Sequence, residues 1–260
     1  MISAISKQLA GFLPQYGRAL WALLTQPRAW VEARARSGFS AWEATTFWAA
    51  SYVFFIVTRF LVFERKADPF AFVAAAFLTD GLHLLLTALA FWALWRAASA
   101  QLQLPQVITA AAYCIGAVMP FQVVLVILMF AAIQFLSPEA FVITANILNG
   151  CADIAATLDL FGAVTSGALE AGWLGIAALA LYAIAFFALS GVFIFYSVVF
   201  VQVLRRLAPV GTPVFLLFCA SGFVLWLLAG MVSAVIDVML LSDTEACLQV
   251  SDILQSGGAQ

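Results

Sequence analysis

Charged residues are scarce in this chain. Its 260 residues include only 11 lysines and arginines and 13 aspartates and glutamates, or 9 %, whereas an ordinary soluble domain has roughly 25 %. Hydrophobic residues make up 65 %, and the mean hydropathy is +1.09. A soluble fold of this size could not bury so much apolar surface. The composition therefore excludes a soluble enzyme, a nucleic-acid-binding protein and a disordered chain, and it predicts a multi-span membrane protein.

Motifs for catalysis and for metal binding are also missing. The single histidine excludes an HExxH motif and any two-histidine metal site made by this chain alone. The sequence has no GxSxG, GxGxxG or phosphate-loop motif and no haem-attachment motif. We therefore expect a protein that is not an enzyme and that holds no cofactor and no metal.

Long apolar runs fill most of the sequence. A helix that crosses a bilayer needs about 20 consecutive apolar residues. We expect an all-α polytopic membrane helix bundle, with five transmembrane helices in a domain that covers residues 42–241. The remaining parts are a cytoplasmic region at 1–41 and a short outer-side tail at 242–260. The predicted spans are 43–63, 70–95, 106–136, 173–204 and 213–241, and the longest connection is an outer loop at 137–172.

The N-terminal region has amphipathic and basic segments. Apolar residues follow the spacing of one helix face, and a second segment beginning at Pro27 carries several arginines. We interpret residues 15–37 as one or two interfacial helices on the inner membrane surface, where the basic side chains meet anionic lipid. The alternative, which stays open, is that these helices pack on the transmembrane bundle. The face consists of Tyr16, Ala19, Leu20, Leu23 and Leu24, and the membrane-surface arginines are Arg28, Arg34 and Arg36.

The distribution of basic residues predicts the orientation. If the N-terminus is cytoplasmic, eight of the 11 lysines and arginines lie inside, including Arg96, Arg205 and Arg206. The outer loop and the tail contain no lysine or arginine. We expect a bacterial inner (plasma) membrane protein with its N-terminus inside and its C-terminus outside. Cys151 and Cys247 then share the outer side, where a disulfide between them is permitted, and the bridged and free states both stay open.

Four ionisable residues are not explained by topology. In the second span, Asp80, His83 and Thr87 are spaced i, i+3 and i+7 and so share a helix face. Arg59 and Asp237 lie close to the outer ends of the first and fifth spans. Ionisable groups inside a membrane are costly unless paired, and they often mark function. The cluster of Arg59, Asp80, His83 and Asp237 is therefore either a structural pairing or a proton or ion site.

Small residues in the fourth span indicate close helix contacts. Ser190 and Gly191 lie on the same side as Ala180 and Ala183, and small residues allow membrane helices to approach each other.

The order of these parts resembles the Yip1-domain family of membrane proteins, particularly its bacterial branch. The resemblance covers roughly residues 20–241, and it implies a non-enzymatic role in membrane organisation or trafficking through protein contacts. It assigns no catalytic residues. The residues that carry it are Gln26-Pro27-Arg28-Ala29-Trp30 ahead of five closely spaced spans, and Ala111-Ala112-Tyr113 followed by Pro120 in the third span.

The leading hypothesis is a scaffold or accessory subunit of a membrane complex. Its partners would be membrane lipids and other membrane subunits, or a second copy in a homo-oligomer. The alternative is a small proton- or ion-coupled transporter or channel that uses Asp80 and His83. A third option is membrane remodelling by the helices at 15–37.

Overall fold

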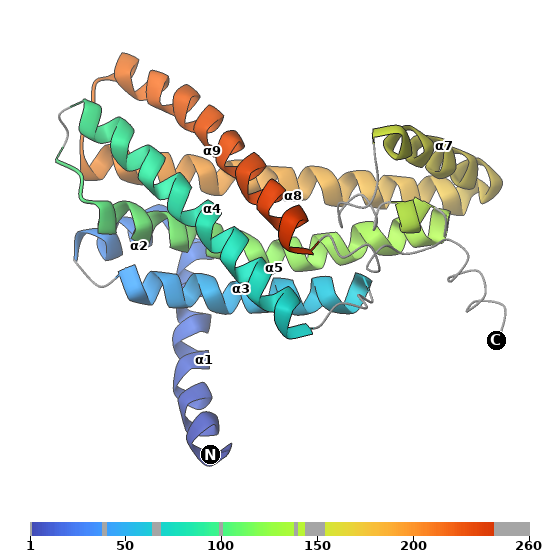
Figure 1. The fold of residues 1–260 in the computed structure, drawn as a ribbon, viewed down its shortest axis with the longest axis horizontal. Coiled ribbons are helices and arrows are strands. Elements are labelled where there is room, and N and C mark those ends of the chain that lie inside the picture. The colour runs from blue at the N-terminus through green and yellow to red at the C-terminus, as the bar shows by residue number, and fades with distance from the viewer. Residues whose placement is uncertain are drawn as a thin grey trace. The chain divides into compact units, whose positions relative to one another are not determined.

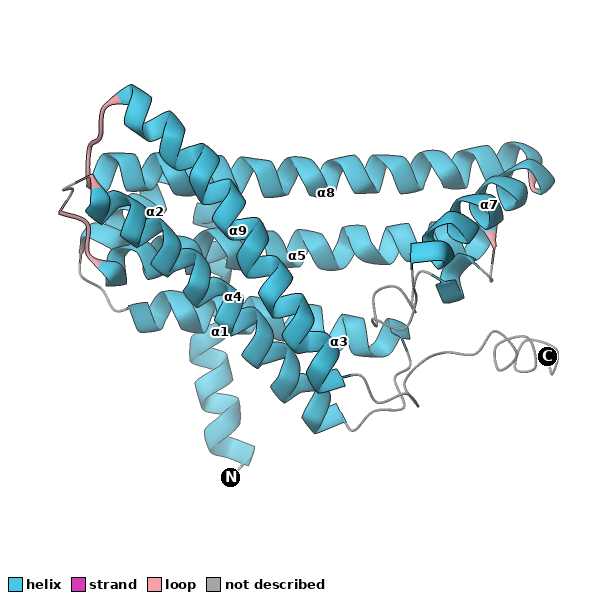
Figure 2. Cartoon of the chain, turned by 45° about the horizontal axis from the view of Figure 1, so that its top comes forward, coloured by secondary structure: helices cyan, strands magenta, loops and turns pink. Residues whose placement is uncertain are grey.

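A computed structural model describes most of the chain. Its backbone is described for residues 2–37, 41–63, 69–98, 101–137, 140–143 and 154–241, and its side chains for 13–37, 41–57, 73–98, 101–137, 140–143 and 162–232. Almost all of the described residues are helical, and they contain no strand (Figures 1 and 2). The predicted all-α fold is confirmed. The labelled helices are α1 (Ile2–Thr25), α2 (Pro27–Arg36), α3 (Ala41–Phe63), α4 (Pro69–Ala97), α5 (Leu104–Leu136), α7 (Ile154–Glu170), α8 (Gly172–Leu207) and α9 (Thr212–Leu241).

Within the described residues, four helices are long and apolar enough to cross a membrane. They are Val73–Ala97 of α4, the whole of α5, the whole of α8, and Thr212–Val232 of α9, with mean hydropathies from 1.7 to 2.4. This finding agrees with the predicted integral membrane protein and with four of the five spans. The first predicted span corresponds to α3, whose side chains are described only as far as Val57. A fifth span therefore stays a prediction.

The N-terminal region forms two helices that meet at Gln26. Pro27 is the first residue of α2, a position where proline suits a helix because no helical N–H is needed there. Helix α1 begins at Ile2 and continues through Pro14, so the predicted start at residue 15 was too late. An internal proline removes one backbone hydrogen bond, and in this helix that loss does not end the helix.

The outer loop predicted at 137–172 is partly helical. It contains α7, which ends at Glu170, and α8 begins two residues later. Gly172 has φ +58°, a left-handed conformation that glycine adopts without steric cost. The short link between α7 and α8 therefore depends on a glycine at this position.

The residue contacts divide the chain into two compact units. Unit 1 comprises Met1–Phe54, Gly81–Pro120 and Val192–Gly230. Unit 2 comprises Phe55–Asp80, Phe121–Gly191 and Met231–Gln260. Helices α3, α4, α5, α8 and α9 each contribute residues to both units.

An aromatic cluster forms the core of unit 1. Trp95 of α4 is fully buried, and its ring lies 5.0 Å from Phe218 of α9 and 6.3 Å from Phe91. Phe91 in turn meets Phe200 of α8 edge to face at 5.0 Å. The indole N–H of Trp95 donates to the carbonyl of Ala208 at 3.1 Å. These contacts join α4, α8 and α9 and satisfy the one polar group that Trp95 buries.

Small residues let the helices approach each other in both units. In unit 1, a Cβ added to Gly116 of α5 would lie 3.0 Å from the backbone of Trp48 in α3. In unit 2, Gly167 of α7 lies directly against the carbonyl of Leu136. Leu136, Ala168 and Ala178 are buried together there, so α7 packs on the end of α5 and the start of α8.

Candidate functional site

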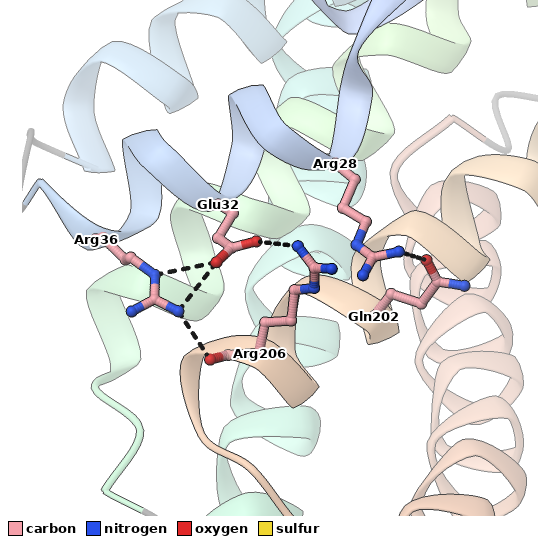
Figure 3. A network of polar contacts seen from close by, with 5 residues as sticks. All are labelled: Arg28, Glu32, Arg36, Gln202 and Arg206. Atoms are coloured by element: carbon pink, nitrogen blue, oxygen red, sulfur yellow. Dashed lines mark hydrogen bonds and ion pairs between the residues drawn. The ribbon is translucent and has the colours of Figure 1, made fainter.

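A network of five polar residues joins α2 to the end of α8 in unit 1 (Figure 3). At its centre, one carboxylate oxygen of Glu32 accepts hydrogen bonds from Nε and Nη2 of Arg36 at 3.2 and 3.0 Å. The other accepts from Nη1 of Arg206 at 3.2 Å. Arg36 also donates to the backbone carbonyl of Arg206 at 3.0 Å, and Arg28 donates to Gln202 at 3.3 Å. We call Arg28, Glu32, Arg36, Gln202 and Arg206 the α2–α8 network.

Apolar burial reinforces this network. Val31 and Ala35, on α2, are 0 % and 2 % exposed. Leu23 of α1 is also fully buried, and its carbonyl accepts a hydrogen bond from the hydroxyl of Tyr196 in α8 at 3.1 Å. Both N-terminal helices therefore pack on protein.

The three predicted membrane-surface arginines all have protein partners. Arg28 and Arg36 belong to the α2–α8 network, while Arg34 pairs with Glu43 at 3.3 Å and stacks on Trp30 at 4.5 Å. These contacts match the alternative in which the N-terminal helices pack on the bundle. The sequence could not decide between the two, because a basic helix face has the same pattern whether it meets lipid or carboxylates.

The charge of Glu32 depends on its arginine neighbours. Burial acts to raise the pKa of its carboxyl group, but the hydrogen bonds and positive charges of Arg206 and Arg36 together outweigh burial and hold the pKa below its ordinary value. The carboxylate form is therefore favoured, and the network stays ionised at neutral pH.

A cavity of about 660 Å³ lies in unit 1 beside the Arg34–Glu43 pair. Residues from α1, α2, α3 and α5 line it, and they combine basic, acidic and aromatic side chains. Burial raises the pKa of the Tyr16 hydroxyl, and its hydrogen bond with Ser51 at 3.0 Å opposes this effect in part. The sequence alone does not reveal this cavity, because its wall comes from four separate segments. The lining residues that we use below are Tyr16, Arg18, Trp30, Arg34, Trp42 and Glu43.

The predicted intramembrane cluster is described only in part. His83 is half-buried in unit 1, where its ring lies 5.8 Å from Trp226 of α9. A Cβ on Gly230 of α9 would lie 3.3 Å from the same ring. Asp80 is half-buried one helical turn earlier in α4. The other two members, Arg59 and Asp237, lie outside the described side chains, and the predicted cysteine pair, Cys151 and Cys247, lies outside the described residues.

Thr87 adds a polar group to the His83 face of α4. It is 4 % exposed, and its hydroxyl has no hydrogen-bond partner among the described residues. A buried hydroxyl without a partner is unusual. Among the described residues, no three histidine, cysteine, aspartate or glutamate side chains gather where they could hold a metal ion.

The sequence matches no protein-family model, and comparisons with curated proteins and with solved structures give no match either.

We expect Glu32→Gln to loosen α2. The neutral amide loses the attraction to two partly exposed arginines, which we expect to cost about 1 kcal/mol. Hydrogen exchange of the α2 amides in the full chain should then accelerate about fivefold at neutral pH. Because the pKa of Glu32 is lowered in the folded chain, its stabilising effect is complete above its ordinary pKa of 4.5. It is lost as the pH falls through the lower, folded value.

The matched control is Glu170→Gln, which removes an exposed carboxylate at the end of α7. That variant should leave α2 exchange unchanged. Equal α2 exchange in Glu32→Gln and the unmodified chain would show that the ionised network does not hold α2.

Proposed function

We propose that this protein is an integral membrane scaffold or accessory subunit without catalytic activity, which binds other transmembrane helices through the outward face of α8. The observation that carries the proposal is a set of exposed residues on the part of α8 that belongs to unit 2. Ala180, Ile184, Phe187 and Gly191 recur at i, i+4, i+7 and i+11, so they share one helix face.

This face combines large apolar side chains with small residues. Ile184 and Phe187 are 66 % and 71 % exposed. Ala180 and Gly191 are also exposed, and a Cβ at Gly191 would meet nothing within 4 Å. Glycine inside a helix costs about 1 kcal/mol relative to alanine. Gly116 and Gly167 are each explained by a close helix contact, whereas Gly191, like Gly17 and Gly162, has no such contact among the described residues. A partner helix that approaches closely at Gly191 would explain it.

The distribution of basic residues supports a cytoplasmic N-terminus. Unit 1 contains the ends of α4 and α8 and the starts of α3, α5 and α9. Eight of the 11 lysines and arginines belong to this unit. Under the positive-inside rule this grouping favours unit 1 on the cytoplasmic side of a bacterial inner membrane.

Membership of the Yip1-domain family stays a proposal that rests on the order of the spans and on the segments around Trp30 and Tyr113. A role in membrane organisation through protein contacts, which that resemblance implies, agrees with a scaffold.

We expect Gly191→Leu to weaken the association. The leucine side chain would fill the space in which a partner helix packs, whereas the helix itself would become more stable because leucine has the higher helix propensity. After mild extraction of the full chain, the association constant for the oligomer or the bound partner should fall by about tenfold, which corresponds to about 1.4 kcal/mol.

Gly162→Leu in α7 is the matched control, because a Cβ there also meets nothing within 4 Å. It should leave association unchanged. A native chain that is a monodisperse monomer without partners, or a Gly191→Leu variant that associates as well as the native chain, would contradict the scaffold.

A proton- or ion-coupled transporter is the second candidate. The unpartnered hydroxyl of Thr87, one turn after His83 and two turns after Asp80, favours it, because these groups make α4 polar along one face. In this reading Asp80 and His83 carry the proton or the ion.

Asp80→Asn distinguishes transport from a structural role. If Asp80 transfers protons, the folded variant in proteoliposomes should lose at least about 90 % of a pH-dependent flux, since an amide cannot titrate. Circular dichroism and size-exclusion chromatography check the fold. Unchanged flux in a folded variant contradicts transport through Asp80, and failure to fold indicates a structural pairing instead.

A further inference from the structure

The cavity in unit 1 brings together both signs of charge and two indole rings. Arg18 and Arg34 reach it from α1 and α2, and Glu43 reaches it from α3. The side chains of Arg34 and Glu43 are 33 % and 44 % exposed, so a ligand can reach both. The volume of about 660 Å³ falls within the usual range of small-molecule sites, roughly 300–1,000 Å³.

A positive and a negative side chain of the cavity lie next to each other. Arg34 is 3.3 Å from Glu43, and Arg18 of α1 adds a second guanidinium to the cavity lining. Guanidinium groups suit phosphate oxygens. A carboxylate next to an exposed indole suits an ammonium group, which can also lie over an aromatic face. Trp42, which is 76 % exposed, precedes Glu43 on α3 and supplies that indole.

We propose that this cavity binds the headgroup of a zwitterionic aminophospholipid of the phosphatidylethanolamine type, with its phosphate on Arg18 and Arg34 and its ammonium on Glu43. The headgroup carries a phosphate and an ammonium joined by an ethyl linker, which matches the adjacent positive and negative groups of the cavity. A purely anionic headgroup has no ammonium group to contact Glu43, which would keep its pair with Arg34.

Apolar surface beside the cavity favours a lipid over a soluble phosphoethanolamine ester. Tyr16 lines the cavity, and its ring lies 6.2 Å from Phe54 of α3. Phe54 and its neighbour Val53 are 53 % and 46 % exposed, so a strip of apolar side chains on α3 begins next to the cavity. Acyl chains can lie along this strip, whereas a soluble ester would gain nothing from it. Exposed tryptophans such as Trp42 and Trp21 are typical of the membrane–water boundary.

The test is native mass spectrometry of the full chain, purified in detergent and titrated with phosphatidylethanolamine, phosphatidylglycerol or soluble glycerophosphoethanolamine. We expect one phosphatidylethanolamine to bind at least about tenfold more tightly than phosphatidylglycerol, as one added charge-assisted contact would give. Soluble glycerophosphoethanolamine should bind far more weakly than the lipid.

Three variants assign the groups. Arg18 is exposed, and its Nε donates to the carbonyl of Pro14 within α1, so Arg18→Gln should keep the fold and weaken both lipids by about tenfold. Glu43→Gln should abolish the preference for phosphatidylethanolamine over phosphatidylglycerol. Arg96→Gln, which removes an exposed arginine from α4 outside the cavity, should bind as the native chain does.

Three results would overturn the proposal. The first is equal binding of the two lipids by the native chain. The second is an unchanged preference in Glu43→Gln, or unchanged binding in Arg18→Gln. The third is binding of glycerophosphoethanolamine as tightly as the lipid, which would make the ligand a soluble ester.

Discussion

The ion pairs of Glu32 hold the N-terminal helices in place. The carboxylate is only 18 % exposed and accepts hydrogen bonds from an arginine on α2 and from another on α8. Both arginines favour the ionised form of this partly buried carboxylate. By fixing α2 against α8, the pairs also hold Trp30 and Arg34 in the wall of the cavity, where Arg34 pairs with Glu43 of α3. The cavity therefore depends on the α2–α8 network.

The helices follow from the sequence because a membrane requires long apolar runs, and such runs are visible without tertiary information. The predicted spans at 106–136 and 213–241 begin within two residues of α5 and α9. Helix ends are decided by local polar groups, which explains these small differences. The N-terminal helices were predicted to start at residue 15, whereas α1 begins at Ile2 and contains Pro14.

Helix periodicity predicts which residues of the site share a helix face, but it does not predict contacts between helices. The shared face of Asp80 and His83 follows from their spacing, but the packing of His83 against Trp226 and Gly230 joins helices far apart in the sequence. Arg28 and Gln202 are separated by 174 positions. A lone sequence gives the charges of such residues and not their partners, so lipid and protein contacts remained equal alternatives for the basic N-terminal region.

In a membrane, exposed apolar residues are solvated by lipid, so exposure alone does not indicate a partner. On α8 the exposed apolar side chains share one helix face with two small residues, Ala180 and Gly191, which would let a partner helix approach closely. Open space alone is not the reason, since Gly17 and Gly162 also have no described atom within 4 Å of an added Cβ. Cysteine cross-linking in native membranes tests this claim most directly. We expect Ile184→Cys and Phe187→Cys to cross-link to a partner or second copy, and Phe186→Cys, at an exposed position on another side of the helix, to do so far less. Equal cross-linking at all three positions, or none at 184 and 187, would contradict the scaffold.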